Sequence, residues 1–114
     1  MELKAGESDI RYIKENKEII FEGSMRLASL KEYETVKAFL KDVSKEAKGT
    51  LILNFKSLEF LNSAGITTII LFLIYLKEQG KSKVKILGSR DVPWQTKSLD
   101  NFKKLWSKAV IKFE

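Results

Sequence analysis

The stretch "LILNFKSLEFLNSAGITTIILFLIYLKEQG", residues 51–80, joins a short apolar run to a long apolar segment through a small polar turn. The run at 50–55 is typical of a central strand that is buried on both faces of a sheet. A helix is predicted over residues 63–79, and Gly80 is suited to end it. Eight consecutive apolar residues, Ile69–Leu76, cover every side of this helix. One sheet face is therefore not enough to bury it.

Two strands and one helix are predicted before the central strand. Strands at Ile10–Ile13 and Glu18–Glu22 would form a hairpin around a short polar turn. Ser29 and Glu32 have the spacing of a capping box, which satisfies free amides at a helix start. The helix that follows ends near Gly49 and carries one apolar stripe, made of Tyr33, Val36, Phe39, Leu40, Val43 and Ala47.

Three elements are predicted after the apolar helix: a strand at 83–88, a helix opened by Pro93, and a strand at 109–113. Strands separated by helices imply parallel crossovers, and the hairpin adds an antiparallel pair. The predicted fold class is α/β, with a small mixed sheet of about five strands and about three helices in one domain over residues 1–114. The apolar side of the last helix is predicted to consist of Leu99, Phe102, Leu105 and Trp106.

The composition narrows the classes of function. The 114 residues are 44% hydrophobic and 32% charged, as in soluble globular proteins. The absence of cysteine excludes disulfides and thiolate metal sites, and the absence of histidine removes the commonest general base and zinc ligand. No carboxylates are paired in apolar surroundings, and the glycines form no phosphate-binding pattern. We therefore expect a protein that is not an enzyme and uses no cofactor or metal.

Charge and hydropathy suggest a cytoplasmic protein. Residues 1–10 lack the apolar core of a signal peptide, and the apolar run at 66–76 is shorter than the roughly 20 residues of a membrane span. The formal net charge of +6 lies in residues 77–114, where ten basic residues stand against four acidic ones. The lysines are dispersed without interleaved aromatics, so direct nucleic-acid binding is not expected. A basic domain that binds nucleic acid or a membrane surface is kept as a further alternative.

The polar turn before the apolar helix reads Asn62-Ser63-Ala64-Gly65. Either Asn62 or Ser63 is suited to be the N-cap, because its side-chain oxygen can accept from amides of the next turn. Gly65 would allow the neighbouring backbone to approach closely. Taken alone, this turn predicts no more than a capped helix.

In its context, the segment at 51–66 resembles the hallmark of the STAS domain family, in the anti-sigma-factor antagonist branch. That hallmark is a buried strand ending in Asn/Asp-Leu, a short link with an apolar residue, and Asp-Ser-Ser/Thr-Gly-Leu opening a helix. Gly23 matches the glycine before that family's first helix region, and the predicted element order agrees from residue 10 to 113. The chain resembles a divergent subgroup, because Asn-Ser-Ala-Gly replaces the usual motif. It also has Ser24-Met25-Arg26 where the family commonly has an acidic pair around a leucine.

The resemblance implies a partner switch that regulates transcription. In this family an ATP-dependent kinase of the histidine-kinase-like ATPase fold doubles as an anti-sigma factor and phosphorylates the motif serine. A PP2C-type phosphatase reverses the modification. The unphosphorylated antagonist binds the kinase and frees its other partner. Carried over by position, the phosphoacceptor is Ser63. A phosphate there adds about −1.5 to −2 charges, which a helix N-terminus tolerates.

The apolar helix is expected to divide into a core side and a partner side. The partner-binding face is predicted to include Thr67, Leu71 and Ile74. An alternative is a STAS-like interaction or ligand-sensing module that is not phosphorylated. Trp94 and Gln95 are either partner residues or a packing plug. The stripe expected on the sheet consists of Ile66, Ile69, Ile70, Leu73 and Leu76, next to Lys77.

Overall fold

A computed structural model describes residues 1–47, 49–80, 83–105 and 109–114. It contains three helices and one sheet whose six strands follow each other in chain order. The predicted α/β class with a mixed sheet is confirmed. The elements are β1 (Glu2–Ala5), β2 (Glu7–Ile13), β3 (Glu18–Met25), α1 (Glu34–Glu46), β4 (Leu51–Leu61), α2 (Ser63–Glu78), β5 (Val84–Gly88), α3 (Pro93–Leu105) and β6 (Val110–Phe113).

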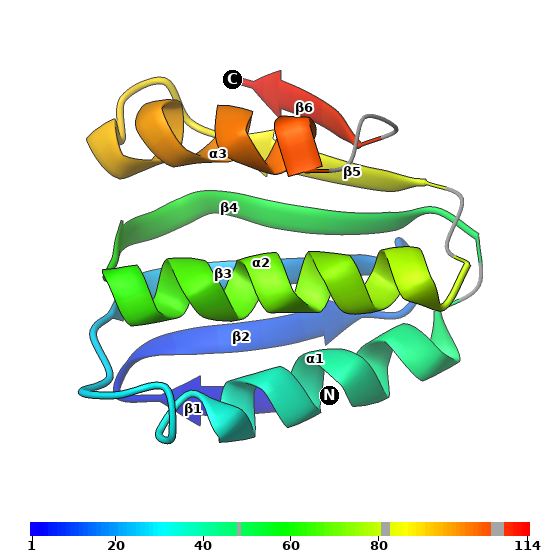
Figure 1. Cartoon of the computed structure of the whole chain (residues 1–114), viewed down its shortest axis with the longest axis horizontal. Helices are drawn as coiled ribbons and strands as arrows, with labels where there is room; N and C mark the ends of the chain where they lie inside the picture. The colour runs from blue at the N-terminus through cyan, green and yellow to red at the C-terminus, as the bar shows by residue number, and fades with distance from the viewer. Residues whose placement is uncertain (48, 81–82, 106–108) are drawn as a thin grey trace.

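The sheet has an antiparallel half and a parallel half. Strands β1, β2 and β3 pair antiparallel, while β3, β4, β5 and β6 pair parallel through helical crossovers, as predicted (Figure 1). The N-terminal strand β1 was not predicted, so the sheet has six strands instead of about five. It is joined to β2 by a tight turn in which Gly6 has a φ of +64°, a conformation that glycine adopts without strain.

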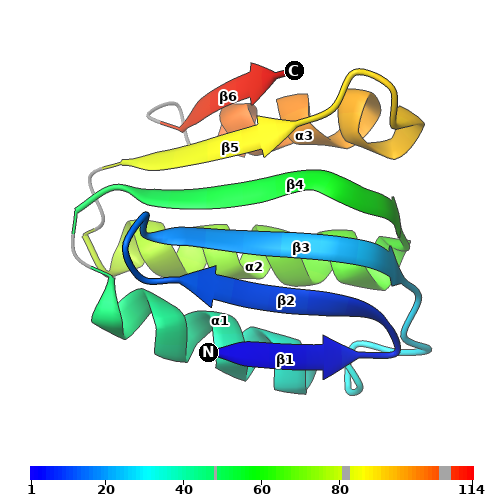
Figure 2. The ribbon, with the colours of Figure 1, turned by 180° about the vertical axis from the view of Figure 1, so that it is seen from behind.

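All three helices cover the same face of the sheet, and Figure 2 shows the other face from the side that carries none of them. The central strand β4 accordingly alternates between buried residues and half-buried or exposed ones. The prediction that this strand is buried on both faces is therefore wrong. The core lies between the helices and one side of the sheet, where Phe21 and Phe55 stack with ring centroids 4.5 Å apart.

The position of α2 explains its apolar sequence. It lies between α1 and α3 on the sheet, so its flanks are buried as well as its base (Figure 1). Phe72 and Thr68 are buried although they lie outside the predicted stripe. Ile66, Ile70 and Lys77 were expected on the sheet, but the first two are half-buried and Lys77 is exposed. The stripe is confirmed at Ile69, Leu73 and Leu76.

The ends of α1 differ from the prediction. Ser29 Oγ accepts from the Glu32 amide at 3.4 Å, and the Glu32 carboxylate accepts from the Ala28 amide at 2.5 Å. These bonds order the turn that precedes α1 and do not cap the helix itself, which begins at Glu34. At the other end α1 stops at Glu46, three residues before Gly49.

The predicted apolar sides of α1 and α3 are largely confirmed. In α3, Leu99 and Phe102 are buried, whereas Trp106 and the side chain of Leu105 lie outside the described part of the chain. Of the apolar residues predicted for α1 and its ends, Phe39 alone is half-buried. The other predicted residues are fully or almost fully buried: Tyr33, Val36, Leu40, Val43 and Ala47.

Candidate functional site

Asn62, and not Ser63, is the N-cap of α2. Its backbone is extended, with φ −76° and ψ 175°, and its Oδ1 accepts from the Gly65 amide. The bond from the Gly65 nitrogen to Asn62 Oδ1 is 3.0 Å long. Ser63 is the first residue of the helix. The two candidate caps in the sequence thus have different structural roles.

The Asn62 side chain also connects α2 to the start of α1. The Tyr33 hydroxyl donates to Asn62 Oδ1 at 2.6 Å, and Asn62 Nδ2 donates to the Leu27 carbonyl at 2.8 Å. The Tyr33 oxygen accepts from the Leu27 amide at 3.3 Å and lies 3.2 Å from the Met25 carbonyl. Burial raises the pKa of Tyr33 above its ordinary value of 10.0, so the phenol stays a donor at neutral pH. We call this set of bonds the Tyr33–Asn62 network.

Gly65 stands where a larger residue fits only if its neighbours shift. A Cβ at this position would lie 2.2 Å from Leu61 Cδ1 and 2.8 Å from the Tyr33 hydroxyl oxygen. The expected close approach therefore occurs, but the approaching atoms belong to side chains and not to the neighbouring backbone. The small residue allows the start of α2 to pack directly against the Tyr33–Asn62 network.

Ser63 is exposed, and its hydroxyl forms no hydrogen bond within the described residues. Thr67 and Leu71 follow at intervals of four residues and are also exposed, so all three lie along one side of α2. Leu71 is 41% exposed, which is unusual for a leucine in the middle of an apolar helix. Ile74, the third predicted partner residue, is half-buried. We call Ser63, Thr67 and Leu71 the α2 stripe; it extends about 12 Å along the helix.

A groove of about 150 Å³ runs beside the α2 stripe, between α1 and α2. Leu30, which is 52% exposed, forms part of its rim from the turn before α1. One signal for this groove is present in the sequence, namely a leucine within the mostly polar segment at 28–32. Six residues line the groove: Leu30, Tyr33, Glu34, Lys37, Thr68 and Leu71.

Trp94 and Gln95 are structural residues at the start of α3. The buried Gln95 Nε2 donates to the Phe55 and Leu58 carbonyls at 2.5 and 3.0 Å, and Trp94 Nε1 donates to the Leu58 carbonyl at 2.8 Å. Strand β5 pairs with β4 only along residues 51–54, so carbonyls beyond that point need other donors. The interpretation as a packing plug is confirmed.

Neither a metal site nor a membrane-spanning helix is found in the part of the chain that the structure describes. No group of three or more acidic, histidine or cysteine side chains is arranged to hold a metal ion among these residues. Among the described helices, none is long and apolar enough to cross a bilayer.

Comparison with known proteins identifies the fold. No protein-family model and no curated protein matches the chain. One chain of the complex between the diguanylate cyclase SiaD and its activator SiaC from Pseudomonas aeruginosa superposes with a TM-score of 0.73 at 16% identity, covering 100% of this chain and 99% of that chain. SiaC of the same organism gives a TM-score of 0.72 at 16% identity and 100% and 98% coverage. Apo-SiaC gives 0.73 at 16% identity, with 98% and 97% coverage. The chain therefore shares its whole fold with these structures.

Proposed function

We propose that this chain is a non-enzymatic regulator that binds a partner protein through the α2 stripe and releases it when Ser63 is phosphorylated. The observation that carries the proposal is the division of roles at the turn. Asn62 caps α2, and the Ser63 hydroxyl beside it is exposed and not used for structure within the described residues. A modification of Ser63 can therefore change the surface without removing the cap.

The N-terminus of α2 is electrostatically suited to carry a phosphate on Ser63. Ser63 occupies the first position of α2, where free amides and the helix dipole favour negative charge. A phosphate adds about −1.5 to −2 charges, and its desolvation opposes the docking of an apolar partner surface. Helix α2 keeps its fold while the Ser63 end of the stripe, about 12 Å from Leu71, becomes strongly negative.

The partner surface extends beyond Ser63. Thr67 and Leu71 continue the α2 stripe, and the neighbouring groove adds a small apolar recess with Glu34 and Lys37 at its edge. An exposed leucine beside such a recess is typical of a docking site for an aliphatic side chain of a partner. Ile74 is half-buried, so it contributes at the border of this surface.

The STAS-like motif indicates the partners. We propose a kinase of the histidine-kinase-like ATPase fold that acts as an anti-sigma factor and modifies Ser63, with a PP2C-type phosphatase that restores the serine. A second candidate is an activator of a signalling enzyme. It is favoured by the match to SiaC, an activator of a diguanylate cyclase, over nearly the full length of both chains. In both cases the chain acts by binding a protein.

Phosphorylation by the kinase tests the proposal directly. Incubation with the kinase and ATP should add one phosphate, detected by intact mass and located by peptide mapping. Ser63→Ala should abolish the labelling, whereas Thr67→Ala and Ser57→Ala, which remove other exposed hydroxyls, should not. A phosphate at another residue would reject Ser63 as the switch. No phosphate from a kinase that binds the chain would instead support the interaction module without phosphorylation.

A further inference from the structure

The face of the sheet opposite the helices is uncovered in the described structure (Figure 2). Strand pairing aligns its residues in rows across the sheet. One row runs from Glu2 through Arg11, Ile20, Asn54 and Leu87 to Lys112. We call this surface the open face. It lies on the other side of the sheet from the α2 stripe, so the two surfaces can be occupied together.

Charges of opposite sign occupy the two halves of the open face. Strands β1, β2 and β3 contribute two basic residues, Lys4 and Arg11, against five acidic ones. Strands β4, β5 and β6 contribute three basic residues, and β4 also carries the exposed Glu59. Glu114 follows β6 and is paired with Lys56 at 2.7 Å and with Lys112 at 3.8 Å, so this half has a smaller, positive net charge. The acidic residues of the first half are Glu2, Glu7, Asp9, Glu18 and Glu22, and the basic residues of the second half are Lys56, Lys85 and Lys112.

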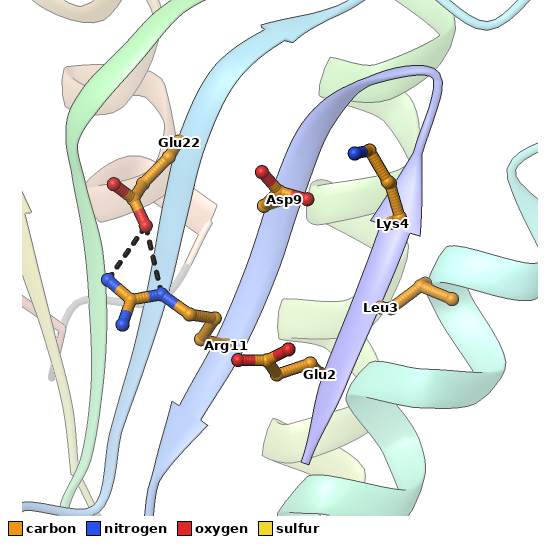
Figure 3. A pocket seen from close by; sticks show the side chains of 6 residues that line it. All are labelled: Glu2, Leu3, Lys4, Asp9, Arg11 and Glu22. Atoms are coloured by element: carbon orange, nitrogen blue, oxygen red, sulfur yellow. Dashed lines mark hydrogen bonds and ion pairs between the residues drawn. The ribbon is translucent and has the colours of Figure 1, made fainter.

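Figure 3 shows the acidic half from close by. A shallow hollow of about 420 Å³ is lined there by Glu2, Asp9 and Glu22 together with Arg11. Arg11 binds only one oxygen of Glu22, through Nε at 2.9 Å and Nη2 at 2.7 Å. Lys4 and Leu3 complete the lining of the hollow. Glu2 and Asp9 are exposed, and within the described residues neither they nor the second Glu22 oxygen has a hydrogen bond or ion pair, so the hollow keeps acceptors for cations from another molecule.

The middle of the open face is less polar than its halves. Ile20 on β3, Ile52 on β4 and Leu87 on β5 are half-buried there, and Ile13 lies beside Glu18 in the neighbouring row. An apolar centre between two charged halves of opposite sign is an arrangement that complements its own copy.

We propose that the open face binds a second copy of this chain, with the two sheets stacked face to face around a two-fold axis. The charges determine the direction of the axis. An axis along the strands, between β3 and β4, places the acidic half of each copy over the basic half of the other. An axis across the strands would place acidic half over acidic half. In the first arrangement Glu22 faces Ser57 of the second copy, next to its Lys56, and Glu2 faces its Lys112.

The size of the face indicates a weak and reversible dimer. Six strands at about 4.8 Å spacing make the sheet about 24 Å wide, and the eight residues of β3 extend about 26 Å. The projected area of about 600 Å² per copy is near the lower limit of specific interfaces. The two α2 stripes would then point away from each other on the outside, so that the dimer presents two docking sites to a partner.

Complementary charge reversal tests this inference independently of Ser63. Sedimentation velocity from about 1 µM to about 500 µM should show a monomer–dimer equilibrium that weakens in salt. The variant Glu2→Lys/Glu22→Lys makes both halves basic, and Lys56→Glu/Lys112→Glu makes the second half acidic. Each alone should raise the dimer dissociation constant at least about ten-fold. An equimolar mixture of the two should restore dimers. Lys97→Glu/Lys104→Glu, on the helix side, should leave the wild-type equilibrium unchanged.

A cross-link tests the geometry of the dimer. The chain has no cysteine, so Asn54→Cys supplies a single thiol close to the proposed axis. A short bismaleimide should join Asn54→Cys into dimers, and it should not join Lys97→Cys. A wild-type chain that stays monomeric at all concentrations would overturn the proposal, as would a mixture of folded variants that fails to restore dimers. A monomer whose Lys56, Lys85 and Lys112 bind heparin would assign the face to a polyanion instead.

Discussion

Replacing Asn62 by alanine should destabilise the fold far more than replacing Ser63. Asn62→Ala removes the acceptor of the Gly65 amide and of the Tyr33 hydroxyl, as well as the donor to the Leu27 carbonyl. Ser63→Ala removes a hydroxyl that forms no hydrogen bond within the described residues. The two neighbouring substitutions therefore form a matched pair that separates the structural residue from the proposed regulatory one.

The magnitude follows from the bonds that are lost. Removing an Asn N-cap costs about 0.5–2 kcal/mol, and loss of the bond to Leu27 adds about 0.5–1.5 kcal/mol. The Tyr33 hydroxyl loses its 2.6 Å acceptor but keeps the Met25 carbonyl at 3.2 Å, so its contribution is smaller. The expected loss of unfolding free energy for Asn62→Ala is about 1–4 kcal/mol, against less than about 0.5 kcal/mol for Ser63→Ala.

Urea unfolding followed by circular dichroism measures both values. Asn62→Ala should lower the midpoint without changing the slope m, and its Tm should fall by about 4–16 °C, at about 4 °C per kcal/mol for a chain of this length. Equal losses of unfolding free energy for Asn62→Ala and Ser63→Ala, or a larger loss for Ser63→Ala, would refute the division of roles between the two residues.

Three further predictions concern the surroundings of the turn. Leu71→Glu should weaken partner binding, measured by titration calorimetry, while the unfolding free energy stays nearly unchanged; the buried control Leu73→Ala should cost about 2–5 kcal/mol. Gly65→Ala should cost about 1–3 kcal/mol in urea unfolding, since its Cβ meets Leu61 and Tyr33; a neutral effect would contradict the tight packing. Because the pKa of Tyr33 is raised in the fold, the unfolded chain releases the proton first, and stability should fall as the pH rises past 10.0. The Tyr33→Phe variant should lose less stability over the same pH range than the wild type. An equal loss would exclude Tyr33 as the cause.

The fold was largely predictable from the sequence because its strands and helices have clear local patterns. Strand β1 escaped prediction because two of its four residues are charged and its partner β2 was already assigned to a hairpin. That one face of the sheet is left uncovered was also not predicted, for a related reason. An apolar run such as 50–55 does not reveal whether its second face is covered, and here Ile52 and Asn54 remain half-buried.

Only those features of the site that lie within one helix were predictable from the sequence. The spacing of Ser63, Thr67 and Leu71 and their position on one side of a helix follow from helical periodicity. The choice of Asn62 as the cap depends on Tyr33, which lies 29 residues earlier in the chain and meets Asn62 only in the folded structure. The groove likewise depends on Leu30, which stands out in a mostly polar segment but comes to line the same groove as Leu71 of α2 only in the folded structure.

The central claim, that phosphorylation of Ser63 controls partner binding, is tested most directly by one titration. The purified kinase that modifies the chain is titrated with the unphosphorylated and the phosphorylated protein, and circular dichroism confirms that both forms are folded. We predict that the phosphorylated form binds at least about ten-fold more weakly, because its charge opposes docking of the partner over the Ser63 end of the α2 stripe. Equal affinity of two folded forms would contradict the account and leave the chain as an interaction module that Ser63 does not regulate.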